Sequence, residues 1–369
     1  MTHIERVRVA LAGGRPDRVP RGEFALEPGL VAALVRREKA GTAAGAGDLS
    51  SSWRTDAAFP GHTTRRNPGA SFQSEIAARE LLGMDLLAVT PAAPVAEQGS
   101  DSYQDAWGCR YTNRGKLKVF LAPAIPDIGA AAGYTLPDPA SFDLQAIRRW
   151  REETDFFVLA FVDGPFQGTG RLFDFTEFLL AAAAREGVIK ELAAAVADFN
   201  LELARLCRQA GAHGIIIGDD IAYDRGTYIR PDLWRELFLP LLRCQVEGLK
   251  EMDLPVLYHS DGNLQAVLPD LAGLPLDGLQ GLEPAAGMDI GAVKREYGEK
   301  LCLMGNFDLD LLVTGNPDTI TAAVHSLLDV AAPGGGYIFS TACGILHASL
   351  PPENVLALYR AVDEYGRYQ

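Results

Sequence analysis

From about residue 156 onward, short apolar or β-branched runs alternate with stretches that have helical periodicity. Each run ends in a cluster of polar or glycine residues, a pattern typical of strands that alternate with helices. The runs predict six strands, in the segments FFVLAFVDGP (156–165), GIIIGDDIAY (214–223), PVLYHSDGN (255–263), DGLQGLEP (277–284), KLCLMGNFD (300–308) and YIFSTACG (337–344).

The segments between these strands carry helix start and stop signals. Pro231 and Pro317 each open a helical stretch, at a position where the missing N–H of proline costs nothing. The helical zone 175–210 is interrupted by Gly187 and ends at Gly211, a residue type that commonly follows a helix. We therefore expect helices joined to the strands by short connections.

In the N-terminal half, RGEFALEP (21–28) and DLLAVTP (85–91) each have the pattern of a strand followed by a loop, which brings the expected strands to eight. Eight parallel strands with intervening helices predict an α/β fold, the (β/α)₈ or TIM barrel. No repeat or linker divides the chain, so we expect residues 1–369 to form a single domain with an N-terminal extension. Residues 41–63 lack an apolar period, which predicts a flexible loop, either a lid or a simple insertion.

Composition and charge restrict the classes of partner. With 48% hydrophobic and 22% charged residues, the chain is close to the average for soluble globular proteins. The net charge of −14 argues against nucleic acid and anionic membranes as partners, because phosphate recognition needs a basic surface. The five cysteines form no C-x-x-C pair, and the sequence contains neither a signal-peptide pattern nor a membrane-spanning apolar run. We therefore expect a cytoplasmic protein.

Polar residues at the ends of the predicted strands are the first candidates for chemistry, because the carboxyl ends of barrel strands form the catalytic face. His259 and Asp261 end one strand, Glu283 ends the next, and Cys343 ends the last. Imidazole, carboxylate and thiol groups that converge are suited to a divalent metal. Each residue alone also has a structural interpretation, as a core histidine, a helix cap, a solvated acid or a buried thiol. Together they predict a metal site.

The pair Asp219-Asp220 ends another strand. Successive strand residues point in opposite directions, so at most one of the two enters the barrel mouth while the other faces the loop or caps a helix. The inward one is a candidate catalytic base, a candidate substrate anchor or a residue that hydrogen-bonds to a metal ligand. Further candidates for contact with a small-molecule substrate are Glu23, Phe166, Tyr223, Asn306, Asp308 and His347.

Five segments in a fixed order, GDDIAY, RPDLWRELFLPLL, YHSDGN, GLEPAAGMDI and MGNFD, resemble the uroporphyrinogen decarboxylase superfamily. This superfamily contains the decarboxylase of haem synthesis and zinc methyltransferases that move methyl groups among corrinoids, thiols and methylated substrates. The resemblance extends over most of the chain. It implies a (β/α)₈ fold with the active site in the barrel mouth.

The methyltransferase branch typically holds zinc with His-x-Cys, a later Glu and a final Cys. Here Glu283 lies 22 positions after Asp261 and Cys343 lies 60 positions after Glu283, close to the spacing of that branch. The chain departs from the pattern at Asp261, which occupies the place of the first Cys. The exchange keeps a ligand charge of −1 but replaces a soft ligand by a hard one, so iron or manganese joins zinc as an expected metal.

The decarboxylase branch carries an arginine-rich N-terminal segment resembling RQAGRY, where this chain has RGEFALEP. Uroporphyrinogen bears many carboxylates, and a mouth lined by acids would repel it. The leading expectation is therefore a metal-dependent methyltransferase with His259, Asp261, Glu283 and Cys343 as metal ligands.

Two alternatives to the methyltransferase stay open, a decarboxylase in which the inward residue of Asp219-Asp220 handles protons, and a non-catalytic barrel that binds a ligand or a corrinoid partner. A corrinoid would arrive on a partner protein, since the chain has no D-x-H-x-x-G motif. We also expect a homodimer, the commonest assembly of soluble oligomers.

Overall fold

The computed structural model describes residues 1–41, 71–99, 102–114 and 117–368. Apart from Gly41, the loop predicted at 41–63 lies outside these residues. The chain divides into two units. Unit 1 comprises Met1–Ala88 and Asp289–Gln369, and unit 2 comprises Val89–Met288.

Unit 2 contains four parallel strands that are hydrogen-bonded in the order β7 (Phe157–Asp163), β8 (Gly214–Gly218), β11 (Val256–Ser260) and β12 (Gly278–Gly281). Nearly every residue of these strands is buried. Continuous apolar runs such as FVLAFVD predict this burial, because parallel strands are covered on both faces. All four strands lie where the sequence predicts them.

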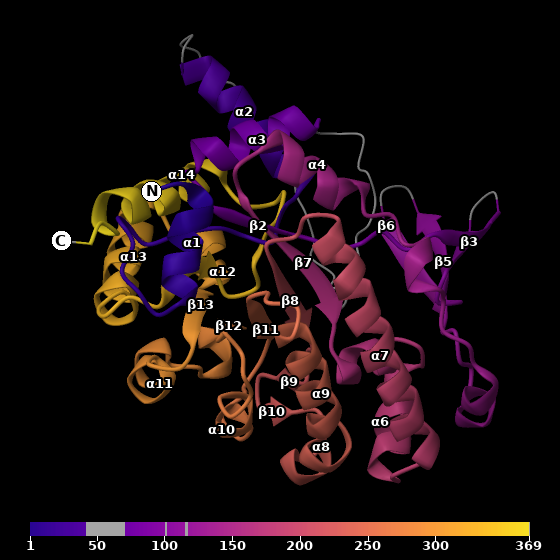
Figure 1. Cartoon of the computed structure of the whole chain (residues 1–369). Helices are drawn as coiled ribbons and strands as arrows, with labels where there is room; N and C mark the ends of the chain where they lie inside the picture. The colour runs from indigo at the N-terminus through magenta and orange to yellow at the C-terminus, as the bar shows by residue number, and fades with distance from the viewer. Residues whose placement is uncertain (42–70, 100–101, 115–116, 369) are drawn as a thin grey trace. The chain divides into compact units, whose positions relative to one another are not determined.

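Helices connect the parallel strands of unit 2, and in Figure 1 α7 and α9 pack against each other and beside β7 and β11. Pro231 occupies the first turn of α8, and the helical zone is broken at Gly187, both as predicted. The helical elements of unit 2 are η1 (Ile128–Gly133), η2 (Pro139–Ser141), α4 (Gln145–Glu153), α5 (Pro165–Gly170), α6 (Phe175–Ala183), α7 (Gly187–Gln209), α8 (Pro231–Leu237), α9 (Leu239–Lys250), α10 (Leu268–Leu271) and η3 (Pro284–Ala286). The short strands β9 (Ala222–Tyr223) and β10 (Gly226–Thr227) form a hairpin after β8.

Unit 2 also has an antiparallel sheet that the sequence analysis did not predict. Its strands are β3 (Val95–Gln98), β4 (Ser102–Asp105), β5 (Arg110–Arg114) and β6 (Leu117–Ala122), in that order. Tyr111 stacks on Tyr103 at 5.3 Å and meets Phe120 edge-on at 5.7 Å. Cross-strand aromatic pairs of this kind stabilise a sheet that lacks a continuous apolar run.

Unit 1 contributes a second set of parallel segments. Strand β13 (Cys302–Phe307) pairs with β14 (Tyr337–Thr341), and Arg21 bridges Phe339 of β14. Gly22 in turn bridges Leu86, the first residue of β2 (Leu86–Val89). The order is therefore β13, β14, the 21–22 segment and β2. Each unit has an α/β architecture with parallel strands, as predicted.

The remaining elements of unit 1 flank these strands. Pro317 lies in the first turn of its helix, as predicted. The elements are α1 (His3–Leu11), β1 (Ala25–Leu26), α2 (Pro28–Gly41), α3 (Phe72–Leu81), α11 (Ile290–Tyr297), α12 (Leu309–Thr314), α13 (Pro317–Ala331), β15 (Ile345–Leu346) and α14 (Pro352–Tyr365), with β1 and β15 paired in parallel.

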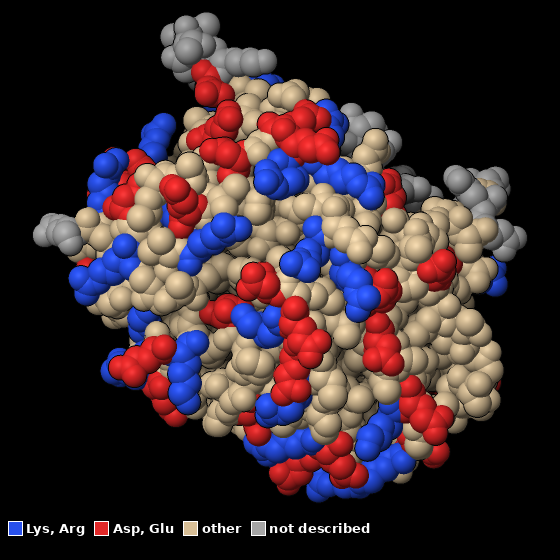
Figure 2. Space-filling model, in the orientation of Figure 1, with Lys and Arg blue, Asp and Glu red and all other residues tan. Residues whose placement is uncertain are grey.

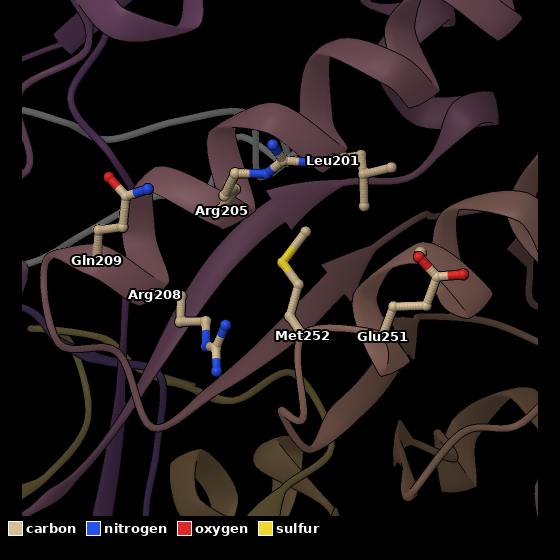
Figure 3. Close-up of a pocket in the computed structure, with 7 residues that line it drawn as sticks. Leu201, Arg205, Arg208, Gln209, Glu251 and Met252 are labelled. Atoms are coloured by element: carbon tan, nitrogen blue, oxygen red, sulfur yellow. The ribbon is translucent and has the colours of Figure 1, made fainter.

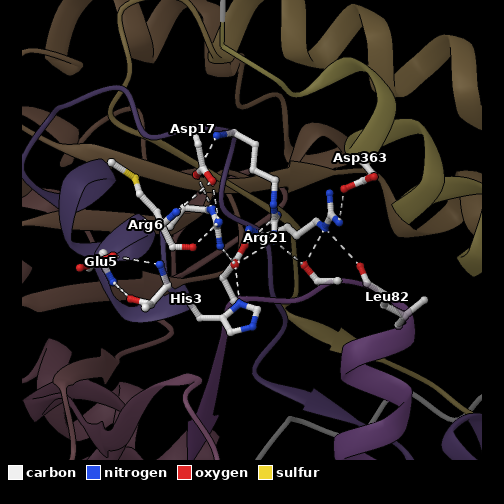
Figure 4. Close-up of polar contacts among 12 residues, drawn as sticks. His3, Glu5, Arg6, Asp17, Arg21, Leu82 and Asp363 are labelled. Atoms are coloured by element: carbon white, nitrogen blue, oxygen red, sulfur yellow. Dashed lines mark hydrogen bonds and ion pairs between the residues drawn. The ribbon is translucent and has the colours of Figure 1, made fainter.

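A buried ionic network fixes the N-terminal segment of unit 1 at the amino end of β2 (Figure 4). The fully buried Asp85 accepts hydrogen bonds from Nη1 of Arg6 at 2.6 Å and from Nη1 of Arg18 at 3.0 Å. It also accepts the backbone N–H of Arg21, whose Nη2 donates to Asp363 at 2.7 Å. Buried charges are tolerated only when they are paired and hydrogen-bonded, so this network has a structural role.

On the face shown in Figure 2, basic and acidic side chains are interspersed, without an extended basic patch among the described residues. Within the described part of the chain, no helix has both the length and the apolar character needed to cross a membrane.

Candidate functional site

Three potential metal ligands converge at the carboxyl ends of β8 and β11 in unit 2. His259 Nε2 lies 3.6 Å from Oδ1 of Asp220 and 4.0 Å from Oδ1 of Asp261. One ligand atom from each of the three residues lies within 4.8 Å of the other two. Asp220 and His259 are buried, and Asp261 is half-buried. We call these three residues the Asp-His-Asp cluster.

The pairing of the two strands brings the cluster together. In the parallel ladder His259 is opposite Gly218, and the Asp219 N–H donates to the carbonyl oxygen of His259 at 2.9 Å. One residue later, the Asp261 N–H donates to Oδ1 of Asp220 at 3.1 Å. The two strands therefore end side by side, and the residues that follow them lie close together, as expected at the catalytic face of parallel strands.

Gln280 orients the imidazole of His259. It lies in β12 directly opposite His259 in the register, is fully buried, and its Oε1 is hydrogen-bonded to Nδ1 of His259. An amide oxygen can only accept, so Nδ1 carries the proton, and in the neutral imidazole the lone pair of Nε2 faces the two carboxylates. This is the arrangement that metal-bound histidines adopt in proteins. The strand-end pattern of the sequence does not single out Gln280, because Gln280 lies within its strand.

Asp219 and Asp220 diverge, in agreement with the alternation of strand residues. Asp219 is fully buried and accepts the Gln167 N–H in the first turn of α5 at 2.8 Å, so it caps that helix. Burial raises the pKa of Asp219 to about 8, and the nearby charges of Asp220 and Asp163 act in the same direction. The Asp220 side chain belongs to the Asp-His-Asp cluster, and its Oδ2 accepts a hydrogen bond from Nε2 of Gln167 at 3.0 Å.

Glu283 follows β12 and is linked to the loop that carries Asp261. Its Oε2 accepts the Gly262 N–H at 3.0 Å. Burial raises the pKa of Asp261 to about 6, and the charges of Asp220 and Glu283 raise it while His259 lowers it. Glu283 thus adds negative charge beside the cluster, although it is not one of the three converging ligands.

Two tyrosines lie beside the cluster, one of which was predicted as a substrate contact. Tyr223 is 42% exposed and stacks on Tyr228 with a centroid distance of 5.5 Å. Tyr228, which the sequence analysis missed, is parallel to the ring of Phe166 at 6.3 Å. Phe166, also predicted as a substrate contact, is fully buried and packs edge-on against Phe178. Phe166 therefore supports the tyrosine stack from the core.

Glu23, another predicted substrate contact, lies in the core of unit 1. It is fully buried and accepts hydrogen bonds from Ser340 Oγ, from the N–H and Oγ1 of Thr341, and from the hydroxyl of Tyr359. Burial raises the pKa of Glu23 against the lowering effect of these donors. The bonds tie the segment after Arg21 to the end of β14.

Cys343 and His347 also belong to unit 1. The Sγ atom of Cys343, which is partly exposed, lies 3.3 Å from the carbonyl oxygen of Ile345. His347 Nδ1 lies 3.5 Å from a carboxylate oxygen of Glu27. Hydrogen bonds to Cys343 and then Glu27 raise the pKa of His347 to about 10. Cys343 and His347 are therefore close to each other, whereas the Asp-His-Asp cluster is part of unit 2.

Asn306 and Asp308, the remaining residues predicted as substrate contacts, lie near the end of β13 and directly after it. Asn306 is buried near the end of that strand. Asp308 caps α12, because its Oδ1 accepts the Asp310 N–H at 2.9 Å. Helix capping accounts for an aspartate at this position without any contact to a substrate.

A surface pocket of about 340 Å³ lies elsewhere in unit 2, at the C-terminal ends of α7 and α9 (Figure 3). Arg205, Arg208 and Glu251 supply its charged groups, and Leu201 and Met252 its apolar ones. These residues come from the outer helices and not from the carboxyl ends of the strands. The geometry therefore favours the Asp-His-Asp cluster as the chemical centre.

The sequence matches a known protein family. The family model described as "Uroporphyrinogen decarboxylase (URO-D)" matches residues 106–365, more than half of the chain. A curated uroporphyrinogen decarboxylase of Pelodictyon phaeoclathratiforme is 31% identical over 161 residues, which cover 42% of this chain and 43% of that protein. One of Azoarcus sp. is 26% identical over 198 residues, covering 53% and 52%. The chain thus spans about half the length of the curated relatives it matches.

Solved structures agree in fold over more of the chain. A methyltransferase from Methanosarcina mazei matches with a TM-score of 0.73 and 22% identity over 99% of each chain. A B12-independent methionine synthase from Shewanella sp. W3-18-1 matches with a TM-score of 0.51 and 13% identity, covering 80% of this chain and 85% of that one. At these identities the likeness concerns the fold.

Proposed function

The chain belongs to the uroporphyrinogen decarboxylase family, and on this premise we propose that it is a metal-dependent methyltransferase that moves a methyl group between a small methylated substrate and a thiol or corrinoid acceptor. The observation that carries the proposal is the Asp-His-Asp cluster with its Gln280 partner. The fold shared with a methyltransferase supports it. We also propose the closed (β/α)₈ barrel, since each unit supplies four parallel segments among its described residues.

The donor set fits a divalent cation. Ligands bonded to one metal at about 2.0–2.2 Å lie roughly 3–4 Å from one another, and the cluster has separations of 3.6 and 4.0 Å. A histidine lone pair and two carboxylates at such distances repel one another unless a cation or a proton lies among them. Two oxygen ligands and one nitrogen ligand suit zinc, iron or manganese.

The protein groups have distinct roles in this proposal. Asp220, His259 and Asp261 would hold the metal, with Glu283 and Cys343 as candidates for the further ligands that the sequence pattern implies. When bound, the metal would act as a Lewis acid that lowers the pKa of an acceptor thiol or polarises a methoxy oxygen. Gln280 holds the imidazole in the binding tautomer, and Gln167 fixes the second carboxylate oxygen of Asp220.

Two partners follow from this function as proposals. A corrinoid acceptor would be delivered by a separate protein, because the sequence has no cobalamin-binding motif of its own. We also propose a homodimer, on the general frequency of such assemblies.

A decarboxylase is the second candidate, and it is favoured by the names of the curated relatives. In that case Asp220, which faces His259, would transfer protons without a metal. The acid-rich surroundings of the cluster disfavour a substrate with many carboxylates, because like charges repel.

Elemental analysis of protein purified without an affinity tag distinguishes the two candidates. We expect about one equivalent of metal in the wild type and a loss of most of it in His259→Ala and Asp220→Asn. Asp224→Asn is the matched control, since Asp224 is an exposed aspartate of the neighbouring hairpin. Wild-type protein that stays metal-free after addition of zinc, iron or manganese, yet turns over a substrate, would establish the decarboxylase candidate instead.

A further inference from the structure

The two tyrosines beside the cluster form a partly exposed aromatic surface. Tyr223 and Tyr228 are stacked with an interplanar angle of 24°, and Tyr228 is parallel to Phe166 within 9°. Phe175 meets Tyr228 edge-on at 5.0 Å. Because Phe166 is fully buried and Tyr223 is 42% exposed, the stack extends from the core of unit 2 to its surface. We call Tyr223 and Tyr228 the aromatic shelf.

Backbone contacts hold the shelf against the loop that carries Asp261. The Asn263 N–H donates to the carbonyl oxygen of Tyr223 at 2.8 Å. A Cβ atom at Gly262 would lie 2.6 Å from the backbone nitrogen of Tyr223, so the two loops are in direct contact. Gly262 also has a φ of +83°, which favours glycine. Burial raises the pKa of the Tyr228 hydroxyl, as do the charges of three nearby carboxylates, those of Asp220, Asp261 and Glu283.

Asp220 and Asp261 face His259, but within the described residues none of the three carboxylates forms an ion pair with a lysine or an arginine. Asp163 at the neighbouring strand end provides the contrast, because Arg171 Nη2 donates to its Oδ1 at 2.6 Å. Even one divalent metal would leave a net negative charge if all three groups are ionised. This remaining negative charge favours the binding of a second cation beside the metal.

We propose that the aromatic shelf and the carboxylates bind a cationic methyl donor, a quaternary or methylated ammonium compound. This inference rests on the methyltransferase function proposed above. A tyrosine ring attracts a cation above its face, and Tyr223, the outer ring of the stack with 42% of its surface exposed, is accessible to a quaternary ammonium group. Nearby carboxylates add attraction that a neutral methoxy compound would not gain. The aromatic shelf and the carboxylates therefore favour a positively charged donor over a neutral one.

The transfer step is balanced for such a donor. A thiolate acceptor attacks one N-methyl carbon, the C–N bond breaks, and its electron pair remains on nitrogen. The positive charge of the ammonium and the negative charge of the thiolate cancel. The products are an amine with one methyl group fewer and a methyl thioether, and no oxidant or reductant is required.

The test is isothermal titration calorimetry of the full chain with choline and with 3,3-dimethylbutan-1-ol. The two compounds have nearly the same shape, but only choline carries the positive charge. We expect choline to bind at least tenfold more tightly than the alcohol. Tyr228→Leu removes the ring on which Tyr223 is stacked and should weaken choline binding about tenfold, and Tyr228→Phe, which keeps that ring, should bind within about twofold of the wild type.

Tyr223→Leu is the second variant, because the exposed side chain can be changed without disturbing the core, and we expect about a fivefold loss of choline affinity. Tyr365→Leu is its matched control, with a similarly exposed tyrosine in unit 1. Equal affinities for choline and the alcohol overturn the proposal. So does choline binding that neither Tyr223→Leu nor Tyr228→Leu weakens.

Metal content measured on the same samples separates this inference from the proposed function. A metal-loaded wild type that does not distinguish choline from the alcohol contradicts the cationic donor and leaves the metal site intact. A metal-free wild type that distinguishes them supports the cation site and contradicts the metal-dependent function.

Discussion

The Nδ1 atom of His259 is hydrogen-bonded to Oε1 of Gln280, its direct partner on the neighbouring parallel strand. This bond determines which ring nitrogen faces Asp220 and Asp261, because a protonated Nδ1 leaves the lone pair on Nε2. The pairing of the two strands thus favours the tautomer of His259 that metal binding requires.

Replacing Gln280 should weaken metal binding without removing a ligand. Loss of a residue that hydrogen-bonds to a metal ligand typically costs 10–100-fold in metal affinity, so we expect a loss of about that size for Gln280→Leu and a smaller one for Gln280→Glu. Competition titration with a chelating dye measures the affinity, and the ¹⁵N shifts of labelled histidine report the tautomer. Gln265→Leu is the control, because Gln265 is exposed and bonds only to nearby loop atoms. Unchanged affinity and tautomer in Gln280→Leu would refute the role of Gln280.

Gly164→Ala should destabilise the protein through Asp219. A Cβ atom at this position would lie 2.2 Å from Cγ of Asp219, the carboxylate that caps α5. We expect a loss of about 1–3 kcal/mol in the free energy of unfolding, the usual cost of overpacking a core. Gly187→Ala at the start of α7 is the control, because a Cβ there meets no atom within 4 Å. Denaturant unfolding measures both, and equal stability of the two variants would contradict the tight packing of Asp219.

The parallel strands could be predicted from sequence because their apolar runs are continuous, as in FVLAFVD and VLYHS. The antiparallel sheet could not, since segments such as SYQD and RYTNR are polar and are stabilised by cross-strand pairs that depend on the fold. Alternation along a strand separates Asp219 from Asp220 without further knowledge. By contrast, Gln280 is 21 positions from His259, and only the strand register brings them together.

The candidate site likewise has residues that could be predicted from the sequence and contacts that could not. Asp220, His259 and Asp261 lie at strand ends, so the type of residue and its position in the pattern single them out as candidates. Glu23 also lies at a predicted strand end, yet its carboxylate is buried and bonded to Ser340, Thr341 and Tyr359, more than 300 positions away. Such long-range partners are invisible in a single sequence. The role of Cys343 as a metal ligand remains a prediction.

The hydrogen bonds of Glu23 predict a structural rather than a substrate-binding effect of mutation. Glu23→Ala removes the acceptor of several buried donors, and each buried group left without a partner costs about 1–3 kcal/mol. We expect a large fall in the melting temperature, while metal content per folded molecule stays at the wild-type level. Glu27→Ala is the control, because its half-exposed side chain lies nearer the surface. A stable Glu23→Ala protein with weakened substrate binding would favour the substrate role.

Asp85 should determine part of the acid stability of the protein. Burial raises its pKa, but His3, Arg18 and Arg6 outweigh this effect and hold the pKa below the usual aspartate value. A depressed pKa in the folded state means that the stabilisation is present above the unfolded pKa of about 3.9 and is lost as the pH falls through the folded value. The wild type should therefore lose stability progressively below about pH 4.

The matching variant is Asp85→Asn, which leaves Arg6 and Arg18 without their anionic partner. We expect a loss of about 3–5 kcal/mol near pH 7, the cost of breaking a buried ion pair. The loss relative to the wild type should shrink as the pH falls below about 4, because the wild-type carboxylate is then protonated as well. Urea unfolding at a series of pH values measures both effects. Asp232→Asn is the control, since its carboxylate is exposed, and a pH-independent difference between Asp85→Asn and the wild type would show that the charge of Asp85 is not what anchors the N-terminal segment.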